Sequence, residues 1–314
     1  MILVCGENVV DVLPGSDGRP RPAAGGGPAN TAVALARLGV PTGFAARLGG
    51  DAHAALIAER LAAAGVSSRF LTRTDAPSAT ATVVFDAEGQ AEYRFALKGA
   101  ADFGWRAEEL PSAAALAGSV EAVHLGSLAA YLSPGADVLE SWVGGIRDAT
   151  MVSFDPNIRP AVGDAAAARA RTESYAALCH LMRASAEDLR FLYGDESPES
   201  VARRWLEAGA RLVVVTDGER GATAYHDGGR VSAAPPAVSV VDTVGAGDTF
   251  NAALLAFWRS RGALSADDFP DVATLAEALR YGYAASALTC TRVGADPPTA
   301  DEVAAFSAAR DGGS

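Results

Sequence analysis

Lysine is almost missing from this sequence, in which Lys98 is the only lysine among 26 basic residues. A phosphate-binding loop of the G-x-x-x-x-G-K-[ST] type requires a lysine, and no such motif occurs. The dinucleotide fingerprint G-x-G-x-x-G is missing as well, which argues against a nicotinamide or flavin enzyme. If the chain binds phosphates, it must therefore use helix N-termini, arginines and a metal ion.

Cysteine and histidine are also scarce. The three cysteines, Cys5, Cys179 and Cys290, are far apart among apolar neighbours, which fits reduced thiols better than a disulfide framework or a zinc site. The four histidines show no metal-ligand spacing. The formal net charge of −12 argues against a nucleic acid or an anionic membrane as partner.

Long hydrophobic runs are missing too. No stretch approaches the roughly 20 apolar residues of a membrane-spanning helix, and the apolar Met1–Cys5 lacks the length and the basic flank of a secretion signal. A hydrophobic content of 49% with 20% charged residues is typical of globular proteins. We therefore expect a cytoplasmic globular protein that acts on small molecules.

Buried strands alternate with helices along most of the chain. The expected strands are Ile2–Cys5, Phe44–Leu48, Val120–Leu125, Met151–Phe154 and Leu212–Thr216. The expected helices are Pro28–Leu38, one capped by Asp51 and running to Ala64, Ala136–Arg147, Ala166–Met182 and Ser197–Ala208. This alternation predicts an α/β fold with a mostly parallel central sheet and helices on both faces.

Two early segments break this pattern. Thr80–Phe85 and Ala91–Leu97 flank a turn at 86–89 and alternate like an antiparallel ribbon, and Val9–Leu13 with Arg21–Ala24 is a candidate second pair. A small sheet inserted into an α/β core is expected to act as a lid. We assign 1–8, 25–78 and 99–314 to the core, and 9–24 and 79–98 to the lid.

The first chemical motif is the glycine-rich segment Asp242–Asn251. Gly245 and Gly247 would let the backbone approach a ligand closely, and the helix that follows would offer unpaired N–H groups to an anion. Asp248 would then lie where a carboxylate meets a transferring phosphoryl group. Glycine and aspartate are also common at helix starts for capping alone, so this segment by itself leaves both interpretations open.

The second motif is Gly25-Gly26-Gly27-Pro28-Ala29-Asn30, which also opens a helix. It could be a flexible turn. Alternatively, the bare backbone of Gly26 and Gly27 packs against a sugar while Asn30 hydrogen-bonds a hydroxyl group. The two motifs together are more specific than either one alone.

These motifs resemble the two signatures of the ribokinase-like carbohydrate kinases, also called the phosphofructokinase B family, and the resemblance extends over nearly the whole chain. It implies the family fold with a β lid, ATP and Mg²⁺ as cosubstrate and metal, and phosphorylation of a primary alcohol of a sugar. Asp248 matches the family's catalytic base. The amides of Gly245, Ala246 and Gly247 match its anion hole.

Other family positions carry over residue by residue. Asp11 matches the sugar-binding aspartate, although a lone aspartate at a strand end can be structural. Lys98 lies near a basic residue that faces the sugar in fructokinase-like members, or is an ordinary edge-strand charge. The resemblance assigns ATP binding to Arg159, Ser185, Thr216, Gly218, Gly221 and Gly247.

The expected metal positions depart from the family. Ser185-Ala186-Glu187-Asp188 aligns with the magnesium-linked N-x-x-E motif, with the asparagine replaced and the acid shortened, so that Glu187 or Asp188 would hold Mg²⁺ through water. Asp242 is either a structural carboxylate or part of a site for a monovalent cation such as K⁺. The backbone matched to that second site lies near Val244, Thr289, Arg292 and Gly294.

Fructose is the expected sugar, because Gly27-Pro28 and Thr291–Pro298 look most like fructokinases. 2-Keto-3-deoxygluconate, ribose and a nucleoside are alternatives. A non-catalytic sugar sensor on a kinase scaffold is an alternative of another class, and a nicotinamide oxidoreductase is a distant third. The exposed edge of the lid is a candidate surface for homodimer formation.

Overall fold

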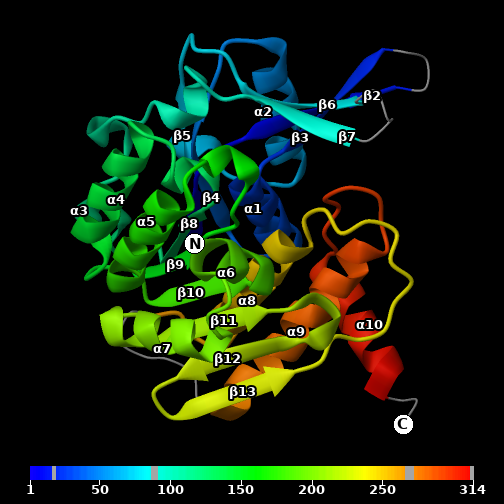
Figure 1. The fold of residues 1–314 in the computed structure, drawn as a ribbon. Coiled ribbons are helices and arrows are strands. Elements are labelled where there is room, and N and C mark those ends of the chain that lie inside the picture. Colours follow the sequence, from blue (N-terminus) through cyan, green and yellow to red (C-terminus); the bar gives the residue numbers. More distant parts are fainter. Residues whose placement is uncertain (16–18, 86–90, 266–271, 312–314) are drawn as a thin grey trace.

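The computed structural model describes residues 1–15, 19–85, 91–265 and 272–311. Its main element is a nine-stranded sheet in the order β13-β12-β11-β10-β9-β8-β1-β4-β5, with a separate four-stranded sheet, β3-β2-β6-β7, at one end (Figure 1). The strands of the large sheet are β1 (Ile2–Cys5), β4 (Thr42–Leu48), β5 (Leu71–Arg73), β8 (Ala122–Gly126), β9 (Met151–Asp155), β10 (Leu181–Ser185), β11 (Leu212–Thr216), β12 (Ala222–His226) and β13 (Gly229–Ala233). Those of the small sheet are β2 (Val9–Pro14), β3 (Pro20–Gly25), β6 (Ala79–Phe85) and β7 (Ala91–Ala96).

Ten α-helices accompany these strands in the described part of the chain. They are α1 (Gly27–Arg37), α2 (Ala52–Ala63), α3 (Ala113–Leu116), α4 (Gly135–Ile146), α5 (Ala165–Leu178), α6 (Ala186–Tyr193), α7 (Pro198–Ala208), α8 (Ala246–Ser260), α9 (Val272–Cys290) and α10 (Ala300–Asp311). No helix in the described ranges has both the length and the apolar character to cross a membrane.

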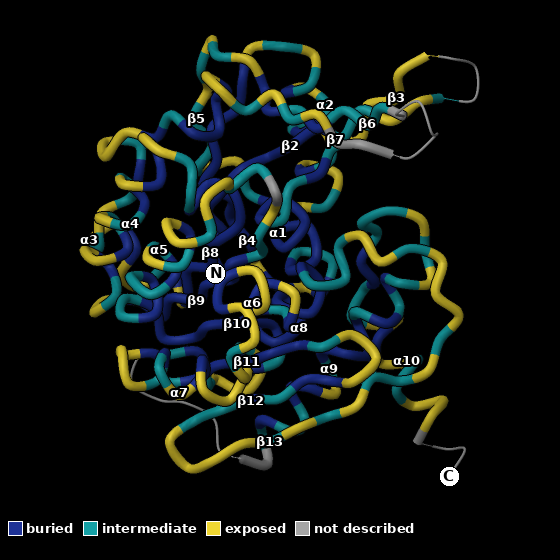
Figure 2. The backbone as a smooth tube through the Cα atoms, viewed as in Figure 1, coloured by how far each residue is buried: buried dark blue, intermediate teal, exposed yellow. Residues whose placement is uncertain are grey.

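Strand β1 shows why the large sheet is covered on both faces. All four of its residues are buried and apolar, and successive side chains point to opposite faces. Ile2 and Val4 belong to the core beneath α1, α2, α8 and α9, whereas Leu3 and Cys5 belong to the core beneath α4, α5 and α7. A parallel strand enclosed in this way needs a continuous apolar sequence, which is why the sequence predicted it correctly. The buried centre of the sheet is visible in Figure 2.

The predicted α/β architecture is confirmed. The seven strands from β11 to β5 run parallel. Strands β12 and β13 add an antiparallel hairpin at one edge that the sequence analysis did not predict. The pairs expected for the small sheet are also observed: β2 runs antiparallel to β3, and β6 antiparallel to β7. The turn predicted at 86–89 lies outside the described residues.

The helix predicted over Ala166–Met182 is wrong at its end. Helix α5 stops at Leu178, and Leu181 begins β10, which lies between β9 and β11. The first four residues of β10 are buried. A short apolar run buried on both faces lacks the alternation of a half-exposed strand, so its pattern cannot be distinguished from that of a buried helix end.

Candidate active site

Two glycines shape the site because they allow backbone conformations and contacts that a side chain would prevent. Gly26 precedes α1 with φ 98°, and a Cβ there would lie 2.9 Å from the Glu7 carbonyl oxygen. Gly245 precedes α8 in the left-handed conformation with φ 77°, and a Cβ there would lie 2.7 Å from the Cβ of Ala295. Both helices can therefore start in close contact with neighbouring chain.

The two motifs meet in space. Asp248, in the first turn of α8, is 7% exposed, and its Oδ2 accepts a hydrogen bond of 2.8 Å from Nδ2 of Asn30 on α1. Nδ2 of Asn157 lies 3.4 Å from Oδ1 of the same carboxylate. Asn30, which was expected to bind a sugar hydroxyl, holds the carboxylate in this structure.

The surroundings of Asp248 change its pKa in opposite directions. Burial raises the pKa of Asp248 to about 6, and the negative charge of Asp155 adds to this rise. The hydrogen bond from Asn30 and the positive charges of Arg159 and Arg183 oppose it. The carboxylate is therefore mostly ionised at neutral pH and can accept a proton.

A buried ion pair that the sequence analysis missed lies behind this carboxylate. Nη1 of Arg183 on β10 donates to Oδ2 of Asp155 at 2.8 Å, and Nη2 donates to the Thr216 hydroxyl at 2.6 Å. Asn251 on α8 also donates to Oδ2 of Asp155, at 2.5 Å. A Cβ at position 247 would lie 3.1 Å from Nη1 of Arg183, so Gly247 lets α8 pack directly on the guanidinium.

A signal for this pair existed in the sequence. Arg183 stands inside the mostly apolar strand Leu181–Ser185, and Asp155 ends the mostly apolar strand Met151–Asp155. Charged residues are rarely buried without a partner, so each one in a buried strand calls for an opposite charge nearby.

The expected anion hole is only partly open. The four N–H groups at a helix start have no partner within the helix. The Ala246 amide, however, donates to the Thr243 carbonyl at 3.2 Å. The amides of Gly245 and Gly247 are thus the better candidates to receive an anion.

Apart from Gly247 on α8, the positions expected to bind ATP lie along the carboxyl ends of β9, β10 and β11. Thr216 ends β11, but its hydroxyl accepts the bond from Arg183. Gly218 (φ 52°) and Gly221 (φ 100°) form the tight turn that follows. The exposed Arg159 bonds to the backbone carbonyls of Asn157 and Ile158.

The two acids proposed for Mg²⁺ differ sharply. Asp188 is buried and accepts hydrogen bonds from the Ser185 amide (2.8 Å), the Ser185 hydroxyl (2.6 Å) and the Ile158 amide (2.7 Å). Its carboxylate is thus occupied in capping α6. Glu187 is exposed in the first turn of the same helix. In the described part of the chain, no three His, Cys, Asp or Glu residues are grouped so as to hold a metal.

Asp242 joins two loops. Its carboxylate accepts hydrogen bonds from the amides of Val244 (3.0 Å) and Gly294 (2.8 Å), and these bonds lower the pKa of Asp242. The Thr289 hydroxyl donates to the hydroxyl of Thr249 on α8 at 3.0 Å, and Arg292 forms an ion pair with Glu302. The segment matched to a monovalent-cation site is therefore anchored beside the start of α8.

The small sheet contributes Asp11 and Lys98. Asp11 on β2 is half-buried, and burial raises its pKa while the positive charges of Arg159 and Arg60 oppose the rise. A Cβ at Gly25 would lie 2.8 Å from Oδ2 of Asp11, so glycine keeps β3 close to this carboxylate. Lys98 is exposed just beyond β7. Arg60 on α2 faces both Asp11 and Asp248 and was missed by the sequence analysis.

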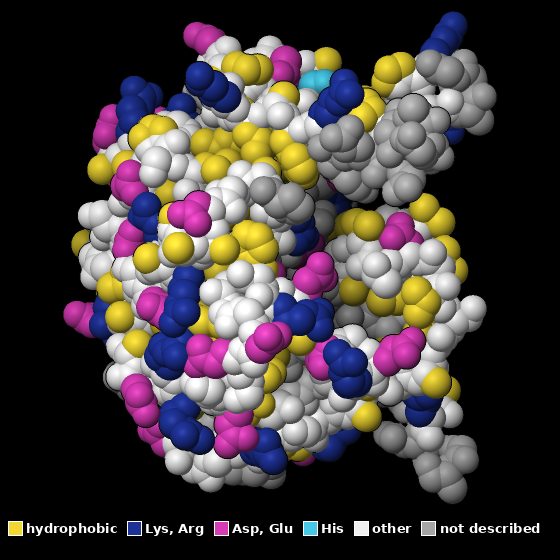
Figure 3. Space-filling model, in the orientation of Figure 1, with side chains coloured by type: hydrophobic (Ala, Val, Ile, Leu, Met, Phe, Trp, Pro, Cys, Tyr) yellow, Lys and Arg dark blue, Asp and Glu magenta, His cyan; other side chains and the backbone are white. Residues whose placement is uncertain are grey.

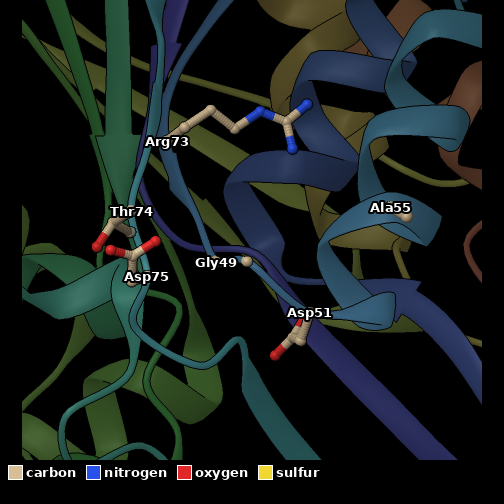
Figure 4. A pocket seen from close by; sticks show the side chains of 7 residues that line it. Gly49, Asp51, Ala55, Arg73, Thr74 and Asp75 are labelled. Carbon is tan, nitrogen blue, oxygen red and sulfur yellow. The ribbon is translucent and has the colours of Figure 1, made fainter.

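Two cavities show how much room lies next to the candidate site residues. The surface is hollowed between the small sheet and the lobe formed by α9 and α10 (Figure 3). A cavity of about 360 Å³ lies elsewhere, lined by residues from the β4–α2 junction and the end of β5, including Asp51 and Arg73 (Figure 4). A second cavity, of about 10 Å³, is lined by Gly27, Ser127, Asn157 and Asp248, among others. Only this second one belongs to the site, and it has at most the room of one water molecule.

A buried carboxylate at the glycine-lined start of a helix, at the carboxyl ends of parallel strands, defines the site of a small-molecule phosphotransferase. Residues 7–302 match the protein family described as "pfkB family carbohydrate kinase". The chain belongs to this family and is a sugar kinase.

Individual relatives are similar over most of their length. The fructokinase of Rhizobium leguminosarum bv. trifolii is 38% identical over 264 residues, covering 82% of this chain and 79% of the relative. The crystal structure of fructokinase from Xylella fastidiosa with bound ATP is similar with a TM-score of 0.88 at 27% identity, covering 99% of this chain and 98% of that one. A fructokinase double mutant from Vibrio cholerae O395, in fructose-, ADP- and potassium-bound form, has a TM-score of 0.84 at 28% identity and covers 97% of both chains.

Proposed function

We propose that the protein transfers the γ-phosphoryl group of ATP to the primary hydroxyl of fructose, forming fructose 6-phosphate. The observation that carries this proposal is the buried Asp248 in the first turn of α8, where Asn30 holds its carboxylate by a hydrogen bond. The similarity to fructokinases, including one with bound ATP and one with fructose, ADP and potassium, supports the choice of substrates.

Asp248 accepts the proton of the sugar hydroxyl as that oxygen attacks the γ-phosphorus. Phosphoryl transfer passes through a loose transition state, so the protein contributes mainly by positioning and by stabilising charge on the phosphoryl oxygens. The amides of Gly245 and Gly247, with the dipole of α8, supply that stabilisation. The buried Arg183 adds positive charge behind the same point.

Mg²⁺ bound with ATP would neutralise charge on the β- and γ-phosphates. Glu187 is the carboxylate that fits this ion, through water, because Asp188 is already satisfied by three hydrogen bonds. K⁺ is a candidate activator at the Asp242 loops, since an ion there would lie beside the start of α8.

Residues 9–24 and 79–98 form the lid in this proposal, with Asp11 gripping two sugar hydroxyls through its two oxygens. Gly26 and Gly27 supply bare backbone on the core side, where a Cβ at Gly27 would lie 3.3 Å from Oδ1 of Asp248. Closure of the lid over the sugar excludes water and so limits hydrolysis of ATP.

The charge balance favours a neutral ketose over an acid sugar. Arg60 and Arg159 face Asp11, and both also face Asp248. The third cation near Asp248, Arg183, is paired with Asp155. These cations and carboxylates balance and leave no surplus positive charge for the carboxylate of 2-keto-3-deoxygluconate, which would be costly to bury unpaired.

A screen of sugars tests this proposal. We expect kcat/KM with ATP and Mg²⁺ to be at least about tenfold higher for fructose than for 2-keto-3-deoxygluconate, ribose or adenosine. A clear preference for the acid sugar would contradict the charge argument. Absence of ATP turnover with every sugar would instead favour the sensor alternative.

A further inference from the structure

Arg60 occupies a bridging position at the site. It lies on the last turn of α2 and is half-buried. Its Nη1 donates to Oδ1 of Asn30 at 2.9 Å, and its Nη2 donates to the carbonyl of Ala295 at 3.1 Å. One guanidinium thus connects α1 with the loop that follows α9.

The bond to Asn30 determines which end of its amide faces Asp248. An asparagine side chain has one oxygen that accepts and one nitrogen that donates hydrogen bonds. Because Oδ1 is taken by Arg60, Nδ2 faces the carboxylate and donates to it at 2.8 Å. The reversed amide would place its oxygen against an ionised carboxylate and its NH₂ group against a cation, so both contacts would be repulsive.

The bond to Ala295 acts on the other side of the site. The side chain of Ala295 packs where a Cβ on Gly245 would stand, at 2.7 Å, and therefore supports the left-handed residue that opens α8. The same loop has a second tether, in which Nη1 of Arg37 pairs with Oδ1 of Asp296 at 2.6 Å. Arg37 provides a natural comparison, because it holds this loop without contacting Asn30.

The charges around Arg60 fit this role. Burial lowers the pKa of Arg60, and the carboxylates of Asp248, Asp11 and Asp296 raise it again, so the guanidinium stays charged. The other charged groups that face Asp248 are Arg159, Arg183 and Asp155. Arg159 bonds to Asn157, whose side chain lies 3.4 Å from Asp248, only at its backbone carbonyl, whereas Arg60 binds the side-chain amide of Asn30 itself.

We propose that Arg60 is a positioning residue for phosphoryl transfer: it fixes the amide of Asn30 so that Asn30 holds Asp248 in the orientation that receives the sugar proton, while it braces the start of α8 through Ala295. This inference rests on the proposed sugar kinase reaction. It assigns Arg60 no contact with the sugar or ATP.

Steady-state kinetics with fructose, ATP and Mg²⁺ test the role. For Arg60→Met we expect kcat about 10- to 100-fold lower with KM for ATP little changed, since small displacements of reacting groups carry losses of this size. The matched control Arg37→Met should stay within about twofold of the wild type. Arg60→Lys keeps the charge but cannot bridge both carbonyl oxygens in fork geometry, so kcat should fall to an intermediate value.

A double-mutant cycle with Asn30→Ala shows whether Arg60 acts through Asn30. We expect Arg60→Met to lower kcat by less than about threefold in the Asn30→Ala background, because the group it orients is gone. A full loss in that background, or wild-type kinetics for Arg60→Met alone, would overturn the proposal. A change in the KM for fructose alone would also overturn it, since it would indicate direct contact with the sugar.

A carboxyl ¹³C NMR titration of the free protein gives a readout that does not depend on turnover. The Asp248 signal is identified by its loss in Asp248→Asn. Its midpoint should rise in Arg60→Met, which loses the charge and the amide orientation, and stay unchanged in Arg37→Met. An unchanged midpoint in Arg60→Met would refute the positioning role even if no sugar is turned over, an outcome that would separately refute the proposed function.

Discussion

The start of α8 and the small sheet form two sides of the proposed site, and they are built very differently. At the start of α8, Asp248 and Asn30 are each 7% exposed and hydrogen-bonded to one another. In the small sheet, Asp11 is half-buried and Leu13 leaves 42% of its surface in water, and Lys98 just beyond β7 is exposed.

The difference in burial between the two sides fits two separate tasks, catalysis on the core side and sugar recognition in the small sheet. The core side carries its charges in a buried network whose geometry is complete without a ligand, as preorganised stabilisation of a transition state requires. Among the described side chains of the small sheet, the buried apolar ones are Val9, Val10, Ala79 and Ala81. A small buried set is typical of elements that move or adjust on binding. We infer that the core determines which reaction occurs and that the small sheet determines which sugar enters.

The largest expected effect comes from Asp248→Asn. We expect kcat to fall about 10²- to 10⁴-fold with nearly unchanged affinity for ATP, as for loss of a general base. Asp164→Asn is the matched control, because Asp164 only caps α5 and asparagine caps helices equally well. Turnover of Asp248→Asn at the wild-type rate would remove Asp248 from its assigned role.

Asp11→Ala tests the recognition side. We expect KM for fructose to rise about 10- to 100-fold while KM for ATP stays the same, because Asp11 would contact only the sugar. Arg21→Ala, an exposed charge removed from the same sheet, should change neither value. A loss confined to kcat in Asp11→Ala would place this carboxylate on the chemical side of the comparison instead.

The pH dependence of kcat/KM follows from the raised pKa of Asp248. The carboxylate must be ionised to accept a proton, so kcat/KM should increase about tenfold per pH unit up to a midpoint near the pKa of about 6 and then level off. Measurement between pH 4.5 and 8.5 checks this. An activity that stays flat down to pH 4.5 would mean that burial does not raise this pKa.

Glu7 marks the border between the two regions, since it is buried just before β2 and accepts a hydrogen bond from the Ala129 amide. Burial raises the pKa of Glu7 from 4.5 to about 7, so the stability that its protonated form contributes is present at low pH and is lost as pH rises through about 7. Glu7→Gln should therefore raise the free energy of unfolding more at pH 8 than at pH 5, by up to about 3 kcal/mol. Urea unfolding at the two pH values measures this; an equal effect at both would contradict it.

The sequence predicted the parts of the site that lie within continuous motifs. Gly245, Gly247 and Asp248 share one segment and Gly26 and Asn30 another, so local chemistry singled them out, and the resemblance to the family then supplied their expected roles. Arg60 was missed because its function depends on Asn30 and Ala295, which lie far away along the chain.

Other errors have a similar physical cause. The first two residues of β10, Leu181 and Met182, were assigned to a helix because a strand buried on both faces has no alternating pattern. With that strand misplaced, Arg183 did not appear opposite Asp155, and the buried pair behind Asp248 could not be predicted.

Hydrogen exchange with and without fructose, in the presence of a non-hydrolysable ATP analogue, most directly tests the division between the two regions. We expect amides of β6 to become protected when fructose binds, because the small sheet would close over the sugar in the proposed mechanism. Amides of α8 should be protected to the same extent before and after, because the core side is already in place. No added protection in β6, or new protection along α8, would show that recognition and chemistry are not divided in this way.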